Sequence, residues 1–176
     1  MKIGFSLGAI AVAMIAVASP IAAQSTSTNK VADKSDWSVF TENNSSECWA
    51  VSLPKETVNT RDGRVVAVRR GDILLYVFFK PSAGLNGQVV FTGGYPFAGE
   101  STVKMEIGGR EYDLYVQGEN AWPANAEADA QIVAAMRAGS EAVLTARSAR
   151  GTVTKDSFSL LGFTASLEEA QRRCAS

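Results

Sequence analysis

Five acidic residues lie close together in the middle of the chain, and their carboxyl groups are the side chains most suited to catalysis. They are Glu100, Glu106, Glu111, Asp113 and Glu119. Two carboxylates are sufficient for glycoside hydrolysis, because one protonates the leaving group while the other acts as base or nucleophile. Acidic residues that alternate with apolar ones are also typical of the solvated face of a β-sheet. We favour the solvated face and keep a carboxylate-dependent hydrolase of glycans as the alternative function.

Histidine is absent from the chain of 176 residues, and this absence removes several kinds of chemistry. A Ser-His-Asp triad or a Cys-His pair cannot be built without imidazole. Zinc, copper or iron sites with histidine ligands are excluded for the same reason. No other catalytic motif is recognisable in the sequence. We therefore expect a protein that is not an enzyme, with no catalytic residue, no cofactor and no metal site.

The two cysteines, Cys48 and Cys174, are the other reactive side chains. In an oxidising compartment an even number of cysteines indicates a disulfide. Two cysteines without histidine cannot form an ordinary zinc site, and a cysteine nucleophile would lack its imidazole partner. We predict an intramolecular Cys48–Cys174 bond, which would tie the C-terminal segment to an early strand.

Aromatic side chains near glycines supply a candidate contact patch, formed by Tyr95, Phe97 and Trp122. Tyrosine and tryptophan are favoured anchors at binding surfaces. The glycine-rich segment 93–99 does not fit a phosphate-binding loop, because it does not join a strand to a helix and lacks the required lysine. Burial in the core is the competing interpretation for these aromatic side chains, and it is the one we favour.

Two arginines are adjacent at Arg69 and Arg70, and Arg70 also begins an Arg-Gly-Asp tripeptide. The tripeptide spells an adhesion motif, but Gly71 and Asp72 have a turn role of their own before a hydrophobic strand, so we interpret the match as coincidental. The arginine pair could bind an anion, although an isolated pair is usually part of a solvated edge. With a formal net charge of −1 and no clustered basic face, the chain is not expected to bind nucleic acid.

Residues 1–23 have the pattern of a cleaved secretory signal peptide. A lysine is followed by an apolar stretch and then by small residues ahead of a cut before Gln24. The apolar stretch is shorter than the roughly 20 residues of a spanning helix, and no second hydrophobic span follows it. We expect a periplasmic, cell-surface or secreted protein without a transmembrane segment after cleavage, with a flexible leader at residues 24–35 and one domain at residues 36–176.

Short strands separated by turn signals dominate the remaining chain and predict a mainly β fold. The expected strands are residues 37–40, 48–53, 64–68, 73–79, 88–92, 102–107, 112–116, 142–147 and 152–160. The apolar residues 73–79 do not alternate with polar ones, so we expect a central strand covered on both faces. These features predict a single-domain β-sandwich or barrel-like fold of antiparallel sheets.

Two helices are expected to accompany the strands. Asn125 can cap a mid-chain amphipathic helix that ends at Gly139, with apolar residues at helical spacing between them. A short C-terminal helix closes the chain, and there Ser166 and Glu169 have the spacing of a capping box.

Several of these segments, taken in order, also resemble a known family. They are Trp37-Ser38-Val39, Cys48 with Val51-Ser52, Pro96-Phe97, the helix before Gly139, and the closing run from Phe158 to Ala165. In this order they resemble the invasion-associated locus B family of alphaproteobacterial exported envelope proteins, and the closing run is the most specific part. Many members carry further cysteines after the first tryptophan and after the Pro-Phe element. This sequence has Phe40 in the first of these regions, so its bridge pattern is simpler.

The resemblance implies an exported single-domain β-sandwich protein, linked in some pathogens to host-cell invasion, and it supplies no catalytic residues. It favours a non-catalytic binding or structural role, with an envelope or host-surface protein or glycan as the partner. A hydrolase of cell-envelope glycans is the alternative. A cleft that holds two carboxyl groups about 5–10 Å apart would support that alternative.

Overall fold

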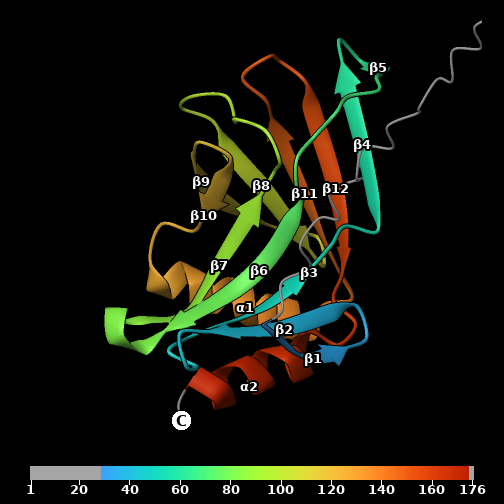
Figure 1. Cartoon of the computed structure of the whole chain (residues 1–176). Helices are drawn as coiled ribbons and strands as arrows, with labels where there is room; N and C mark the ends of the chain where they lie inside the picture. Colours follow the sequence, from blue (N-terminus) through green and yellow to red (C-terminus); the bar gives the residue numbers. More distant parts are fainter. Residues whose placement is uncertain (1–28, 175–176) are drawn as a thin grey trace, which may run out of the picture.

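Twelve antiparallel strands form one continuous sheet in the computed structural model, which describes residues 29–174 (Figure 1). The strands are β1 (Lys30–Lys34), β2 (Trp37–Glu42), β3 (Glu47–Ser52), β4 (Glu56–Arg61), β5 (Arg64–Val65), β6 (Leu74–Lys80), β7 (Leu85–Thr92), β8 (Thr102–Ile107), β9 (Arg110–Gln117), β10 (Asn120–Trp122), β11 (Glu141–Arg147) and β12 (Val153–Ser159). The helices are η1 (Pro81–Ala83), α1 (Ala126–Ala138) and α2 (Phe163–Cys174). The expected mainly β, single-domain fold with a mid-chain and a C-terminal helix is confirmed. The expected signal peptide lies outside the described residues.

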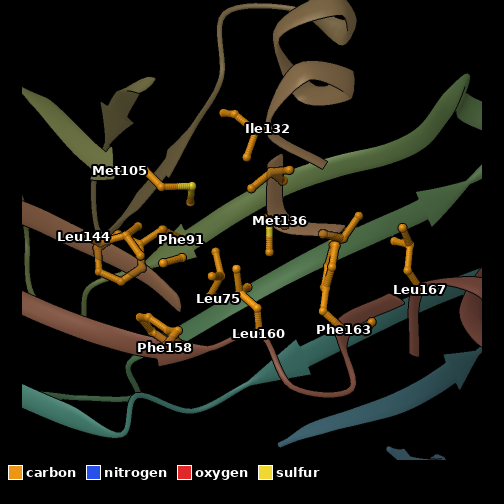
Figure 2. Packing of buried hydrophobic residues seen from close by; sticks show 14 of the residues in the cluster. Leu75, Phe91, Met105, Ile132, Met136, Leu144, Phe158, Leu160, Phe163 and Leu167 are labelled. Carbon is orange, nitrogen blue, oxygen red and sulfur yellow. The ribbon is translucent and has the colours of Figure 1, made fainter. Parts of the chain in front are cut away.

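The sheet is rolled around a single core. Its strand order is β1-β2-β3-β6-β7-β10-β9-β8-β11-β12-β4-β5. Leu75 on β6 and Phe158 on β12 are far apart in this order, yet both are fully buried in one hydrophobic cluster (Figure 2). The two halves of the sheet therefore face each other, which the right-handed twist of strands makes possible. One curled sheet thus supplies both layers of the expected sandwich.

Strand β6 differs from the expectation for residues 73–79. Its burial alternates, and the inward side chains are Leu75, Val77 and Phe79. Tyr76 and Phe78 are only partly buried on the outer face. There Phe78 lies beside Trp49, which stacks on Phe40 with a centroid separation of 5.8 Å. The expectation of cover on both faces is wrong, because this row of neighbouring aromatic side chains takes the place of a second layer.

Helix α1 has the boundaries that its sequence predicts. The side chain of Asn125 accepts a hydrogen bond from the Ala128 N–H at 3.0 Å, which satisfies one of the free donors at the helix start. Gly139 follows the helix, and its N–H donates to the Ala135 carbonyl. Ile132 and Met136 point into the core beside the sheet (Figure 2). The amphipathic pattern therefore placed this helix correctly.

Helix α2 begins three residues before the expected cap. It starts at Phe163, so Ser166 lies inside the helix and is fully buried, and the predicted capping role is wrong. Glu169 pairs instead with the arginines that follow it in the same helix. The Phe163 ring packs edge-on against Trp37, with centroids 4.9 Å apart. Gly162, with φ +90°, precedes the helix where an added Cβ would collide with the Lys34 carbonyl. Tertiary packing, rather than capping chemistry, sets this helix start.

Two expected boundaries differ at the sheet edges. Residues 30–34, expected to belong to the leader, form β1 and pair with β2, with Lys34 opposite Trp37. Their polar composition hides this strand, because an edge strand needs only backbone pairing and a few apolar contacts such as those of Val31. The expected strand 64–68 shortens to the two residues of β5, since only Arg64 and Val65 pair with β4.

Asp129 of α1 covers an incomplete edge of β7. Strand β7 pairs with β10 only at Phe91 and Thr92, so its earlier residues lack a strand neighbour on that side. The Val89 N–H on this edge donates instead to Asp129 Oδ1 at 2.8 Å. A carboxylate aimed at a strand edge also discourages pairing with another chain.

We expect Asp129→Ala to destabilise the fold by about 1–3 kcal/mol, because the Val89 N–H then loses its acceptor. Asp129→Asn keeps a side-chain oxygen and should cost less. Burial raises the pKa of Asp129, against the opposing effect of the Val89 hydrogen bond. A raised pKa means that the folded state favours the protonated carboxyl group. This contribution to the free energy of unfolding is fully present below the unfolded pKa of Asp129 and is lost as pH rises through the folded pKa. Urea unfolding of the wild type and both variants at several pH values measures both effects, and a pH-independent difference between wild type and Asp129→Asn would contradict the second.

Candidate functional site

The residues of the expected contact patch lie in two separate places. Tyr95 and Phe97 touch edge-on, with ring centroids 5.2 Å apart. Phe97 is buried against Phe91 in the core, and its backbone forms a bridge with Ser148. Trp122 lies on β10 and lines a different cavity, next to α1. The three aromatic residues therefore do not form one surface, and Phe97 is a core residue.

The acidic residues of the alternative hypothesis are exposed on the sheet and its turns. Glu106 and Glu111 face each other across the β8–β9 pair. Asp113 forms an ion pair with Lys104 at 2.7 Å. Three cavities, described below, lie beside Arg70, beside α1 and over Trp49. Of the five carboxylates, only Glu119 lines one of them. No pair of them shares any of these cavities, as a glycosidase would require.

A cleft of about 490 Å³ opens at one end of the rolled sheet, and we call it the arginine cleft. The lining residues that matter here are Arg61, Arg69, Arg70, Tyr95, Glu119 and Arg150. Arg61 ends β4, Glu119 lies in the turn between β9 and β10, and Arg150 lies in the turn between β11 and β12. Neighbouring strands β4 and β12 bring two of these segments together, although they are far apart in sequence. The volume is typical of a small-molecule site.

Arg70 forms the inner wall of the arginine cleft and is fully engaged by the protein. Its guanidinium makes two parallel hydrogen bonds of 2.7 Å to the carboxylate of Asp156. It also donates to the Gly93 carbonyl at 2.8 and 2.9 Å. The side chains of Arg70 and Asp156 are 6% and 0% exposed. An adhesion tripeptide needs an accessible arginine, so this burial supports the interpretation of Arg-Gly-Asp as coincidental.

Tyr95 and two glycines complete this wall. The Arg70 guanidinium lies 4.9 Å from the centre of the Tyr95 ring, and the Tyr95 hydroxyl shares a 2.5 Å hydrogen bond with Thr154 Oγ1. Burial raises the pKa of Tyr95, so its hydroxyl stays protonated at neutral pH. Gly94 has φ +71°, and a Cβ there would lie 2.6 Å from the Gly71 carbonyl oxygen. The glycines let two loops touch through their backbones, and this contact fixes the shape of the wall.

Three further arginines face the cleft without an acidic partner. Arg61 donates to Thr152 Oγ1 at 2.7 Å. Arg69 and Arg150 form no hydrogen bond or ion pair with any residue between 29 and 174. Glu119 is the one acidic residue among the lining residues. Asp156 lies behind the lining and forms an ion pair with Arg70. Four arginines against these two carboxylates leave a formal charge of +2 in a chain whose net charge is −1.

Sequence reasoning noticed Arg69, Arg70 and Tyr95 but missed Arg61, Arg150 and Asp156. A signal for Asp156 does exist in strand β12. Thr154, Asp156 and Phe158 share one face of the strand, and that face is buried. An aspartate at an inward-facing position of a strand needs a cationic or hydrogen-bonding partner. No comparable signal marks Arg61 or Arg150, because both are ordinary surface residues until the sheet order is known.

A second cavity of about 540 Å³ lies between α1 and β7, and we call it the helix groove. Its walls include Leu85, Trp122 and Val133. Asp129 also lines it, but its carboxylate already accepts a hydrogen bond from the Val89 N–H. A shallower hollow of about 300 Å³ lies on the outer face of the sheet and is lined by Trp49, Tyr76 and Phe78. Neither cavity gathers unpaired charges in the way that the arginine cleft does. Within residues 29–174 no group of three histidine, cysteine or acidic side chains could hold a metal ion.

The expected disulfide is present between Cys48 on β3 and Cys174 at the end of α2, with their Cα atoms 5.7 Å apart. Both cysteines are buried in the core cluster. The bond fastens the last residue of α2 to the sheet, whereas the Phe163 and Trp37 contact holds the first residue of the helix. No helix in the part of the chain that the structure describes is long and apolar enough to cross a membrane.

A rolled antiparallel sheet, a single domain and one long-range disulfide define a small, mainly β class of protein. A family model described as "Invasion associated locus B (IalB) protein" matches residues 37–171, and the chain belongs to this family. The fold is similar to that of invasion associated protein B from Bartonella henselae, with a TM-score of 0.56 and 17% identity, over 82% of this chain and 98% of that chain. At this identity the likeness shows the fold alone. No curated protein matches the chain.

Proposed function

We propose that the chain is an exported, non-catalytic binding protein of the bacterial envelope, with the arginine cleft as its ligand site. The signal-like pattern of residues 1–23 supports export. The Cys48–Cys174 bond agrees with it, because such bonds persist outside the reducing cytosol. Membership of the IalB family supports a role in the envelope, where a glycan is the partner that we favour. A host-surface glycan would bind to the same residues of the arginine cleft.

The observation that carries the proposal is the rigid, preformed wall of the cleft. Arg70, Asp156, Tyr95 and Thr154 hold each other in place before any ligand arrives. A preorganised wall favours binding because little conformational entropy is lost on association. Hydrolysis of a glycan would need a second, suitably placed carboxyl group, and Glu119 is the lone member of the predicted acidic set in the lining. The cleft is therefore better suited to holding a ligand than to cleaving one.

We expect Ala149→Trp to abolish capture of envelope material by the arginine cleft. Ala149 is exposed and lines the cleft, so an indole there fills the space without disturbing the core. Ala126→Trp is the matched control, because Ala126 is also exposed but lines the helix groove. The measurement is pull-down of glycans, lipids and proteins from envelope extracts by the mature wild type and by both variants.

Loss of capture in the Ala149 variant alone would support the cleft, whereas loss in the Ala126 variant alone would move the site to the helix groove. No captured material from any extract would contradict the binding function. Chain shortening of the captured glycans by the wild type would contradict its non-catalytic character. Recovery of the full-length precursor from the cytosol would contradict export.

A further inference from the structure

We propose that the arginine cleft binds the phosphate monoester of a phosphorylated sugar through Arg61, Arg69 and Arg150. This inference rests on the proposed binding function and names its ligand class. Arg70 is a positioning residue here, since Asp156 and Gly93 already occupy its donors. The other three arginines come from different segments of the chain and line one cavity.

Charge selects a phosphate monoester over a singly charged group. The lining together with Asp156 behind it carries a formal charge of +2, because four arginines stand against Glu119 and the carboxylate that pairs with Arg70. A phosphate monoester carries about −1.5 to −2 charge at pH 7, whereas a carboxylate or a sulfate ester carries a single charge. Arginine forks also match the oxygens of a phosphate group in pairs. Arg69 and Arg150 have no partner within residues 29–174, so their donors are available.

The remaining lining indicates that the phosphate is attached to a sugar. The cleft has a volume of about 490 Å³, which leaves space for a sugar ring beside a phosphate group. Glu119 also lines it, and an ionised carboxylate accepts hydrogen bonds but repels a second phosphate. Sugar hydroxyl groups donate hydrogen bonds and therefore suit Glu119. A polyphosphate, by contrast, would be opposed by the same residue.

The first test compares matched arginine variants by titration calorimetry with glucose 6-phosphate. Arg69→Gln and Arg150→Gln each remove one guanidinium from the cleft. Arg110→Gln makes the same charge change on the exposed start of β9, outside the cleft. We expect each cleft variant to weaken binding about tenfold or more, the double variant to abolish it, and Arg110→Gln to leave it nearly unchanged. Equal binding by all variants would overturn the proposal.

The second test uses pH and ligand analogues. The second ionisation of a phosphate monoester lies near pH 6, so affinity for glucose 6-phosphate should fall between pH 7.5 and 5. Glucose 6-sulfate keeps its single charge and serves as the control, because any pH-dependent change in the cleft, whose charged lining residues are Arg61, Arg69, Arg70, Arg150 and Glu119, would affect both ligands. The chain contains no histidine that could ionise in this interval. An identical pH profile for both ligands would contradict phosphate recognition.

The source of the phosphate is tested with separate probes. Glucose 6-phosphate should bind more tightly than inorganic phosphate, and glucose should not bind. Vesicles of phosphatidic acid in phosphatidylcholine present the same group on a lipid, and binding to them without binding to glucose 6-phosphate would overturn the sugar assignment. Envelope capture that is sensitive to Ala149→Trp but unaffected by Arg69→Gln and Arg150→Gln would refute the phosphate inference while the binding function stands.

Discussion

Replacing Asp156 by alanine is expected to lower the free energy of unfolding by about 3–5 kcal/mol, because it leaves the buried Arg70 without its counter-charge. Asp156 is fully buried and accepts two hydrogen bonds from the Arg70 guanidinium. Once Asp156 is gone, Arg70 keeps only the Gly93 carbonyl and a long hydrogen bond of 3.4 Å to Asn59 Oδ1. A guanidinium that is only 6% exposed and has no counter-charge is strongly unfavourable.

The measurement is equilibrium urea unfolding of Asp156→Ala, monitored by tryptophan fluorescence. Asp113→Ala is the matched control, since it removes the exposed ion pair with Lys104 and should cost less than about 1 kcal/mol. The double variant Arg70→Met with Asp156→Leu should recover much of the loss, because it removes both charges and keeps the volume. A loss for Asp156→Ala as small as that for Asp113→Ala would show that the pair is not a structural centre of the wall.

The same substitution should disorganise the arginine cleft. Arg70 lies over the Tyr95 ring, and Tyr95 in turn bonds to Thr154. Without Asp156 the guanidinium is free to turn toward the cleft and add a positive charge there. Ligand binding by a folded Asp156 variant would then differ from that of the wild type, even though Asp156 makes no contact with the cleft opening.

Removing the Cys48–Cys174 bond should destabilise the protein by about 2–5 kcal/mol. The cysteines are separated by 126 residues, so the bond closes nearly the whole described chain into one loop. In the chain-entropy account, a bond that closes a long loop restricts the unfolded state most. The bond also anchors α2, whose Phe163 packs against Trp37.

The measurement is urea unfolding of the wild type with and without reductant, followed through tryptophan fluorescence. The double variant Cys48→Ala with Cys174→Ala is the control, because its midpoint should be low and insensitive to reductant. Titration of the denatured, unreduced wild type should find no free thiol. A midpoint that reductant leaves unchanged in the wild type would show that the bond contributes little beyond the packing of α2.

Local patterns in the sequence determined the elements that depend on neighbouring residues. Helix α1 was predicted from Asn125 to Gly139, because capping and apolar spacing act within a few turns. The mainly β character followed from short apolar runs between turn signals. The disulfide followed from the presence of two cysteines alone, since they had no alternative partner. Membership of the family could also be anticipated from motifs in order.

Tertiary structure decided where helix α2 begins, how β6 is covered, and that residues 30–34 join the sheet. In each case contacts distant in sequence outweighed the local signal. Phe163 packs on Trp37, and the aromatic row beside Trp49 covers the outer face of β6. β1 pairs with β2 despite its polar composition.

The arginine cleft could be seen only in the folded protein. Arg61 and Arg150 line the same cleft because β4 pairs with β12 near the far edge of the sheet. Side-chain periodicity reports which way a residue faces, whereas strand order depends on pairings between segments many residues apart. A sequence therefore reveals that Asp156 points inward, but only the order of the strands reveals that Arg70 meets it and that other arginines gather beside it.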